Sequence, residues 1–222
     1  MKMGEMLNII TPLHKKSKRD YVGRMIDEKV HCMKIARKYS QEYWDGDRRY
    51  GYGGYSYDGR WAVVAKALIE KYNLPENAKI LDVGCGKGFL MFEFKKLLPK
   101  CTVKGIELSK YAIDNAKEEV KNDILNIKAE DKYPFKDKEF DLVYTNTTLH
   151  NLLISDLKKA LKEIERVGKN KFICVESYRN DEELFNLQCW ALTCEMFFRP
   201  EEWIFLYNEW GYKGDYEFIF FE

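Results

Sequence analysis

The chain has 222 residues, of which 45% are apolar, enough for one domain with a sizeable core. Its 37 Lys and Arg residues are matched by 36 Asp and Glu residues, so it lacks the excess positive charge typical of proteins that bind DNA or anionic lipid. No apolar run reaches the ~20 residues that span a bilayer, and the first 18 lack the apolar stretch of a secretory signal. We therefore expect a cytoplasmic protein without DNA or membrane partners, a monomer or homodimer.

The first 60 residues differ in pattern from the rest of the chain. Residues 19–40 have the apolar spacing of a helix, and residues 43–61 interleave tyrosine, glycine and arginine. We interpret residues 1–60 as a helical extension that ends in a lid, and residues 61–222 as the main domain. Helices are predicted at 61–72, 155–167, 181–198 and 200–211.

Short β-branched runs alternate with these helices, which is the pattern of repeated βαβ units and a mostly parallel sheet. The predicted strands are 79–83, 102–107, 124–128, 140–145, 171–176 and 216–221. In such sheets ligands bind at the carboxyl ends of the strands, near the point where the strand order reverses. Candidate site residues should therefore lie in the loops that follow the strands.

The first predicted strand runs directly into a glycine-rich loop. Gly84, Gly86 and Gly88 alternate with Cys85 and Lys87, and glycine lets a backbone turn sharply and approach a ligand. The spacing is GxGxG rather than the GxGxxG of dinucleotide loops, and no P-loop Gly-Lys-Ser/Thr follows. Asp82, two residues before the first glycine, would repel a pyrophosphate and attract a cationic ligand such as a sulfonium or an amino group.

The second predicted strand ends in Glu107, nineteen positions beyond Gly88. A carboxylate at this place can accept hydrogen bonds from both hydroxyls of a ribose. Together the loop and Glu107 predict a nucleoside-containing ligand with a positive charge, and S-adenosylmethionine has both features.

These motifs resemble those of the class I S-adenosylmethionine-dependent methyltransferases, in particular small-molecule enzymes of the ubiquinone-biosynthesis type. The resemblance covers about residues 60–222. It implies an α/β, Rossmann-like, doubly wound, mostly parallel sheet with helices on both faces and an antiparallel C-terminal strand. It also implies that the cofactor contacts the loop, the second strand end and the loops after the third and fourth strands: Asp82, Gly84, Cys85, Gly86, Gly88, Glu107, Leu108, Ala129, Glu130 and Asn146.

The acceptor site is predicted from two segments. His150 follows the fourth strand and is a candidate general base, although a histidine here can equally pack on the cofactor. The lid offers Tyr50, Tyr55, Tyr57 and Arg60, whose hydroxyls and guanidinium suit a polar or anionic small molecule such as a sugar or sugar nucleotide. A rigid, Tyr-rich loop that only packs on the sheet is the alternative.

The predicted reaction is in-line methyl transfer to oxygen or nitrogen, in which positioning provides most of the rate enhancement. Six cysteines form no CxxC pair and only three histidines accompany them, so no metal site is predicted. Two alternatives remain: a non-catalytic protein that binds S-adenosylmethionine, and an NAD(P)-dependent oxidoreductase.

Overall fold

The computed structural model describes residues 4–222 and contains one six-stranded sheet. Its spatial order is β3-β2-β1-β4-β5-β6, and every neighbouring pair is parallel. The strands are β1 (Lys79–Val83), β2 (Thr102–Ile106), β3 (Ile124–Leu125), β4 (Phe140–Asn146), β5 (Gly168–Glu176) and β6 (Asp215–Ile219). The order reverses between β1 and β4, which places the expected ligand cleft at their carboxyl ends.

The prediction of an antiparallel C-terminal strand is wrong, because β6 runs parallel to β5. The register advances in the same direction on both strands, from Phe172 opposite Asp215 to Glu176 opposite Ile219. Between them the chain passes through α10 (Asp181–Trp190) and α11 (Pro200–Glu209), a crossover long enough to return it to the starting edge of the sheet. The strand sequence, apolar in either direction, carries no signal of its orientation.

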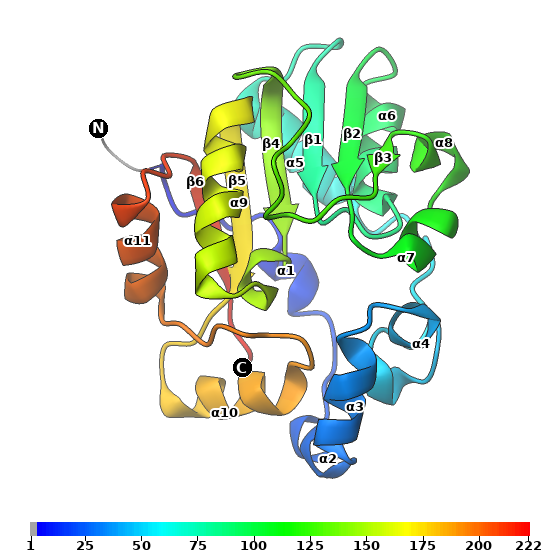
Figure 1. Cartoon of the computed structure of the whole chain (residues 1–222), viewed down its shortest axis with the longest axis vertical. Coiled ribbons are helices and arrows are strands. Elements are labelled where there is room, and N and C mark those ends of the chain that lie inside the picture. The colour runs from blue at the N-terminus through cyan, green and yellow to red at the C-terminus, as the bar shows by residue number, and fades with distance from the viewer. Residues whose placement is uncertain (1–3) are drawn as a thin grey trace.

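Helices cover both faces of the sheet and enclose two apolar cores (Figure 1). α5 (Ala62–Tyr72) and α6 (Phe89–Leu97) bury residues such as Leu68 and Phe94 on one face. α9 (Ile154–Val167) and α11 bury Leu161 and Trp203 on the other. The alternating strand residues divide between these cores, as in other two-sided parallel sheets. Two short helices, α7 (Lys110–Asp114) and α8 (Glu118–Lys121), connect β2 to β3.

The N-terminal extension is attached at the far edge of the sheet. Met6 pairs with Tyr216 of β6, and the buried Glu217 carboxylate accepts hydrogen bonds from the backbone N–H groups of Ile9, Ile10 and Thr11 at 2.6–3.0 Å. Thr11 begins α1 (Thr11–His14). These contacts fix the start of the extension to the last strand.

The extension then crosses to the carboxyl ends of the central strands. Three helices, α2 (Tyr21–Ile26), α3 (Lys29–Ala36) and α4 (Gln41–Trp44), lie beyond this end of the sheet, and a 3-10 turn, η1 (Arg48–Tyr50), follows them (Figure 1). The single helix predicted at 19–40 is thus broken, because Glu28 adopts a left-handed conformation with φ 44°. The extension covers the end of the sheet where ligands are expected.

Other element boundaries also differ from the predictions; for example, β5 begins three residues before the predicted position 171. The strand at 124–128 is reduced to two residues, and the helix at 181–198 ends at Trp190. α9 begins at Ile154, one residue before the predicted start at Ser155. The segment after Trp190 is irregular. The backbone N–H groups of Glu195 and Met196 in this segment both donate to the carbonyl of His150.

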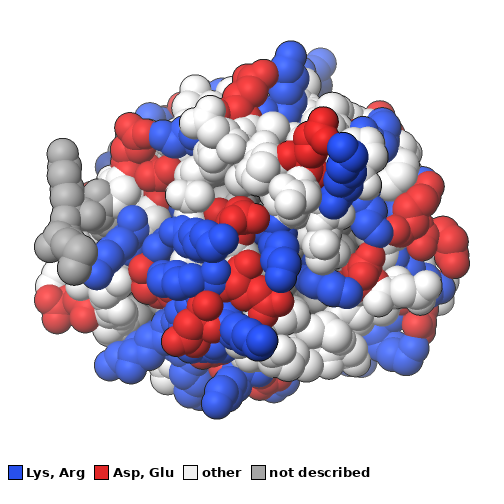
Figure 2. All heavy atoms as spheres, turned by 90° about the horizontal axis from the view of Figure 1, so that it is seen from above, with Lys and Arg blue, Asp and Glu red and all other residues white. Residues whose placement is uncertain are grey.

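Charges of both signs intermingle on the face that is opposite the N-terminal helices (Figure 2). This agrees with the balanced composition and shows no expanse of a single sign on that face. Among residues 4–222, no helix is long and apolar enough to cross a membrane.

Candidate functional site

The glycine loop has a backbone that requires glycine. Gly84, Gly86 and Gly88 have φ angles of 80°, 55° and 71°, in the left-handed region that other residues rarely adopt. A Cβ on Gly84 would lie 2.2 Å from Thr148 Oγ1. The loop is held open to the cleft by the Gly84 and Cys85 N–H groups, which both donate to the Ile106 carbonyl of β2.

Asp82 lies beneath this loop as a buried carboxyl, and residues 4–222 offer it no cationic partner. Its side-chain hydrogen bond comes from the Tyr144 hydroxyl at 2.8 Å, and the residue is only 4% exposed. Burial is the main cause that raises the pKa of Asp82 to about 8, with a smaller contribution from the Glu107 charge. A buried carboxyl of this kind suits a ligand that brings its own positive charge.

Glu107 is directed at the same loop from the end of β2. Its Oε2 accepts the Gly86 N–H at 2.9 Å and its Oε1 accepts the Ser109 N–H at 2.8 Å. Burial raises the pKa of Glu107, while these backbone donors oppose the rise. Both carboxylate oxygens of Glu107 therefore accept backbone N–H groups, one of them from the glycine loop, and its contact with a ribose stays a prediction.

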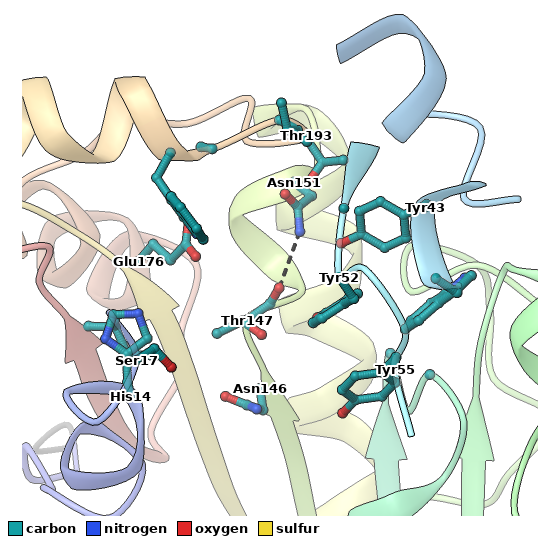
Figure 3. Close-up of a pocket in the computed structure, with 18 of the residues that line it drawn as sticks. His14, Ser17, Tyr43, Tyr52, Tyr55, Asn146, Thr147, Asn151, Glu176 and Thr193 are labelled. Atoms are coloured by element: carbon teal, nitrogen blue, oxygen red, sulfur yellow. Dashed lines mark hydrogen bonds between the residues drawn. The ribbon is translucent and has the colours of Figure 1, made fainter. Parts of the chain in front are cut away.

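A cavity of about 410 Å³ opens beside the loop, between the sheet and the extension. Figure 3 shows Tyr43, Tyr52 and Tyr55 on one side of it and His14, Ser17 and Glu176 on the other, with Asn146, Thr147 and Asn151 between them. Gly84, Cys85 and Gly86 form part of its wall. The volume is within the range of small-molecule sites.

A family model described as a methyltransferase domain matches residues 74–213, which include the loop, Glu107 and the end of β4. The chain belongs to the family of class I S-adenosylmethionine-dependent methyltransferases. Its cofactor is accordingly S-adenosylmethionine, and the oxidoreductase alternative is not supported. The ubiquinone-biosynthesis subtype stays a prediction.

Curated relatives of this methyltransferase act on different molecules. It is 35% identical over 108 residues to an uncharacterized methyltransferase of Schizosaccharomyces pombe, covering 43% of this chain and 38% of the relative. It is 30% identical over 96 residues to a malonyl-[acyl-carrier protein] O-methyltransferase of Priestia megaterium (42% and 35% covered). It is 28% identical over 131 residues to the arginine-hydroxylase NDUFAF5 of Homo sapiens (57% and 36% covered). The chain spans under two fifths of the length of each.

Solved structures share the fold. The YcgJ protein of Bacillus subtilis superimposes with a TM-score of 0.53 at 20% identity, covering 66% of each chain. A candidate methyltransferase of Bacillus halodurans gives 0.55 at 18% identity, covering 66% of this chain and 68% of that one. At these identities the likeness concerns the architecture alone.

The extension of the methyltransferase is fastened onto its glycine loop. Lys87 Nζ lies 2.6 Å from Asp45 Oδ2 and also donates to the Tyr55 carbonyl, and the Tyr111 hydroxyl donates to the same carboxylate. Trp44 donates its Nε1–H to Ser109 Oγ, and its ring edge lies 3.0 Å from the place of a Cβ on Gly86. The indole therefore packs against the loop at Gly86 and is held there by Ser109.

The end of β4 and the 3-10 turn at Leu149–Asn151 contribute polar atoms that have no hydrogen-bond partner among residues 4–222. Asn146 Oδ1 and Asn151 Oδ1 are buried without a hydrogen bond, although both residues line the cavity. The Asn151 amide donates to the Thr147 carbonyl at 3.2 Å, which fixes its orientation (Figure 3). Unpartnered buried acceptors next to a cavity indicate a ligand that supplies N–H or O–H groups.

His150 is part of a buried pair with Glu176, the last residue of β5. Its Nδ1 accepts the Glu176 backbone N–H at 3.3 Å, which leaves the proton of the neutral ring on Nε2, 3.4 Å from Glu176 Oε2. Burial lowers the pKa of His150 to about 3 and raises that of Glu176 to about 7. The histidine is therefore directed at the carboxylate as a donor, and Glu176 is the stronger base.

The structure brings only some of the predicted site residues to the cavity. Those that line it are Gly84, Cys85, Gly86, Asn146, His150, Tyr55 and Arg60. Two lid tyrosines lie elsewhere: Tyr57 donates to Glu93, and Tyr50 packs against His31. The remaining cofactor candidates are not part of its wall: Asp82, Gly88, Glu107, Leu108, Ala129 and Glu130. Ala129 and Glu130 instead contact Tyr133 and Lys128.

Several cavity residues escaped the sequence analysis. Glu176 could have been found as an acidic residue at a strand end, by the same argument that identified Glu107. Trp44, which lines the cavity, was visible within the aromatic segment but carried no signal of its partners. The same holds for Asp45, which lies outside the cavity wall and pairs with Lys87. No group of three or more potential metal ligands occurs among residues 4–222, and each cysteine of that range is free.

Proposed function

We propose that this enzyme methylates an oxygen or nitrogen of a polar small molecule, with sugars and sugar nucleotides as first candidates. The observation that carries the proposal is the cavity of about 410 Å³ between the glycine loop and the extension of the same chain. A site covered by the enzyme's own lid suits a small acceptor better than a polymer. We further propose that the enzyme is cytoplasmic and has no DNA or membrane partner.

Asp82 and Glu107 are the proposed contacts of the cofactor's amino group and ribose, and the backbone of Gly84 and Gly86 is the proposed cradle. The unpartnered Asp82 carboxyl fits a cationic group, since a charge brought by the ligand offsets the cost of its burial. Bound S-adenosylmethionine supplies an electrophilic methyl group, which the acceptor atom takes in line. Positioning of the acceptor by the lid then provides most of the rate enhancement.

Glu176 is the proposed proton acceptor, in place of His150. Its carboxyl lines the cavity, and its pKa of about 7 leaves it about half ionised at neutral pH. His150 Nε2 is directed at this carboxylate and orients it. A hydroxyl acceptor would lose its proton to Glu176 as the new bond to carbon forms.

The test has two steps. First, the effects of S-adenosylmethionine, S-adenosylhomocysteine, NAD and NADPH on the melting temperature are compared. A ligand at ~100 times its dissociation constant should stabilise the folded protein by ~2.7 kcal/mol, which raises the melting temperature by roughly 5–10 °C. Only the two S-adenosyl compounds should stabilise the protein. Second, acceptors are screened for release of S-adenosylhomocysteine. Cofactor binding without turnover of any small acceptor would favour the non-catalytic alternative.

A further inference from the structure

Three arginine side chains converge on the ring of Trp190, at the end of α10. The guanidinium carbons of Arg24, Arg48 and Arg19 lie 4.5, 4.9 and 5.4 Å from the ring centroid. Arg19 and Arg24 come from the start of the extension and Arg48 comes from η1. All four side chains line the cavity.

No carboxylate neutralises these guanidiniums. Among residues 4–222, none lies within ion-pair distance of Arg19, Arg24 or Arg48, whereas Arg49, Arg60 and Arg37 are paired with Asp27, Asp58 and Glu195. Burial is the main cause that lowers the pKa of Arg24 to about 10, and the charge of Arg48 adds to it. The three guanidiniums therefore lie close together without an ion pair among the described residues, and the negative groups that act on them from farther away are Glu176 for Arg19 and Asp27 for Arg24.

Their hydrogen bonds leave donors unused. Arg24 donates to the carbonyls of Trp190 and Arg48, and Arg48 donates from Nη1 to the Gly51 carbonyl. Arg19 Nε is buried with no hydrogen-bond partner. In the described chain, no hydrogen bond is formed by Arg24 Nη2 or by Arg48 Nε and Nη2. These N–H groups can bind a carboxylate or phosphate, which guanidinium matches in a planar, two-pronged geometry.

We propose that the acceptor carries a carboxylate or phosphate group, which Arg24 and Arg48, with Arg19 beside them, bind next to Trp190. This deepens the proposed function by assigning an anionic class of substrate to the same cavity. The negative charge of Glu176 acts on Arg19 and would repel an anion bound there. The carboxylate or phosphate of the acceptor is therefore assigned chiefly to Arg24 and Arg48. The tyrosines of the opposite wall remain available to the body of the acceptor.

The arginines could instead only tie the extension to α10 through carbonyl bonds, and the experiment separates the two roles. The full chain, saturated with S-adenosylhomocysteine, is titrated with inorganic phosphate and with succinate against sodium chloride of equal ionic strength, and its melting temperature and binding heat are measured. The double variant Arg24→Gln/Arg48→Gln is compared with Arg37→Gln. Arg37 is an exposed arginine paired with Glu195 at 2.9 Å, and it does not line the cavity.

Phosphate or succinate should bind wild type and Arg37→Gln alike, and should bind the double variant about 10- to 100-fold more weakly. A purely structural role would lower the melting temperature without changing its dependence on the anion. If the double variant fails to fold, Arg48→Gln alone serves, since Arg48 is the most exposed of the three. Equal anion binding by the variants, or none by wild type beyond chloride, would overturn the proposal.

Matched acceptor pairs form the second arm: a sugar phosphate against the free sugar, and a carboxylic acid against its amide. Release of S-adenosylhomocysteine should occur with the anionic member and fall in the double variant; preference for the phosphate or the carboxylate distinguishes the two sources of charge. Equal turnover of neutral members by wild type and double variant would refute the anion site and leave the methyltransferase proposal intact. Failure of S-adenosyl compounds to bind would refute the methyltransferase proposal. Phosphate titration of the unliganded chain would still test the anion site in that case.

Discussion

Cofactor binding by this enzyme should depend on pH through Asp82. Burial raises the pKa of this carboxyl to about 8, so the unliganded protein holds a proton there at neutral pH. The positive amino group of S-adenosylhomocysteine favours the ionised carboxylate and must displace that proton. Affinity should therefore rise with pH below about 8 and level off above it.

The size of the effect follows from the pKa. At pH 7 a group with a pKa of about 8 is only about one tenth ionised, and at pH 6 about one hundredth. The dissociation constant of S-adenosylhomocysteine should then fall about tenfold between pH 6 and pH 7, equivalent to about 1.4 kcal/mol. Asp82→Asn keeps the shape and the hydrogen bond from Tyr144 but cannot ionise, so its affinity should be weak and nearly independent of pH.

Isothermal titration calorimetry at pH 6, 7 and 8, in two buffers of different ionisation enthalpy, measures both the affinity and the proton released. Glu176→Gln is the matched control, since Glu176 is another buried carboxyl with a raised pKa, at about 7, and it lines the cavity. Wild type and this control should release close to one proton near pH 6.5, and Asp82→Asn none. A flat profile in wild type, or the same slope in Asp82→Asn, would refute the assignment of Asp82 to the amino group.

Three further variants test other parts of the site and fold. Glu107→Ala should bind S-adenosylhomocysteine about 10- to 100-fold more weakly by calorimetry, with a far-UV spectrum unchanged from wild type; wild-type affinity would exclude the ribose contact. Glu176→Gln should lower kcat/KM at least about 100-fold with an active acceptor. Wild-type activity should rise through pH 7 as Glu176 ionises, and the variant should lose this rise. A rise that persists in the variant would show that another group is the base. Glu217→Gln should lower the free energy of unfolding by about 2–4 kcal/mol in urea, because a buried carboxylate accepts three backbone N–H groups; a change below about 0.5 kcal/mol would contradict that anchoring role.

The local sequence predicted correctly those structural features that lie within one strand and the loop after it. β1 was predicted with both of its boundaries, and the left-handed conformations of Gly84, Gly86 and Gly88 agree with the loop expected there. The cofactor follows from the same motif and from the family to which the chain belongs. The division of the chain after residue 60, the oligomeric state and the identity of the acceptor stay predictions.

The sequence by itself determined the sheet, the cofactor loop and its two acidic neighbours, because glycine backbone freedom and alternating apolar runs act over a few residues. Only the tertiary structure decided that β6 is parallel to β5, that His150 is directed at Glu176, and that Arg19, Arg24 and Arg48 meet at Trp190. The arginines and Trp190 are separated by more than 140 positions and have no common local pattern. Packing of the extension against α10, rather than any motif, brings their charges into one cavity.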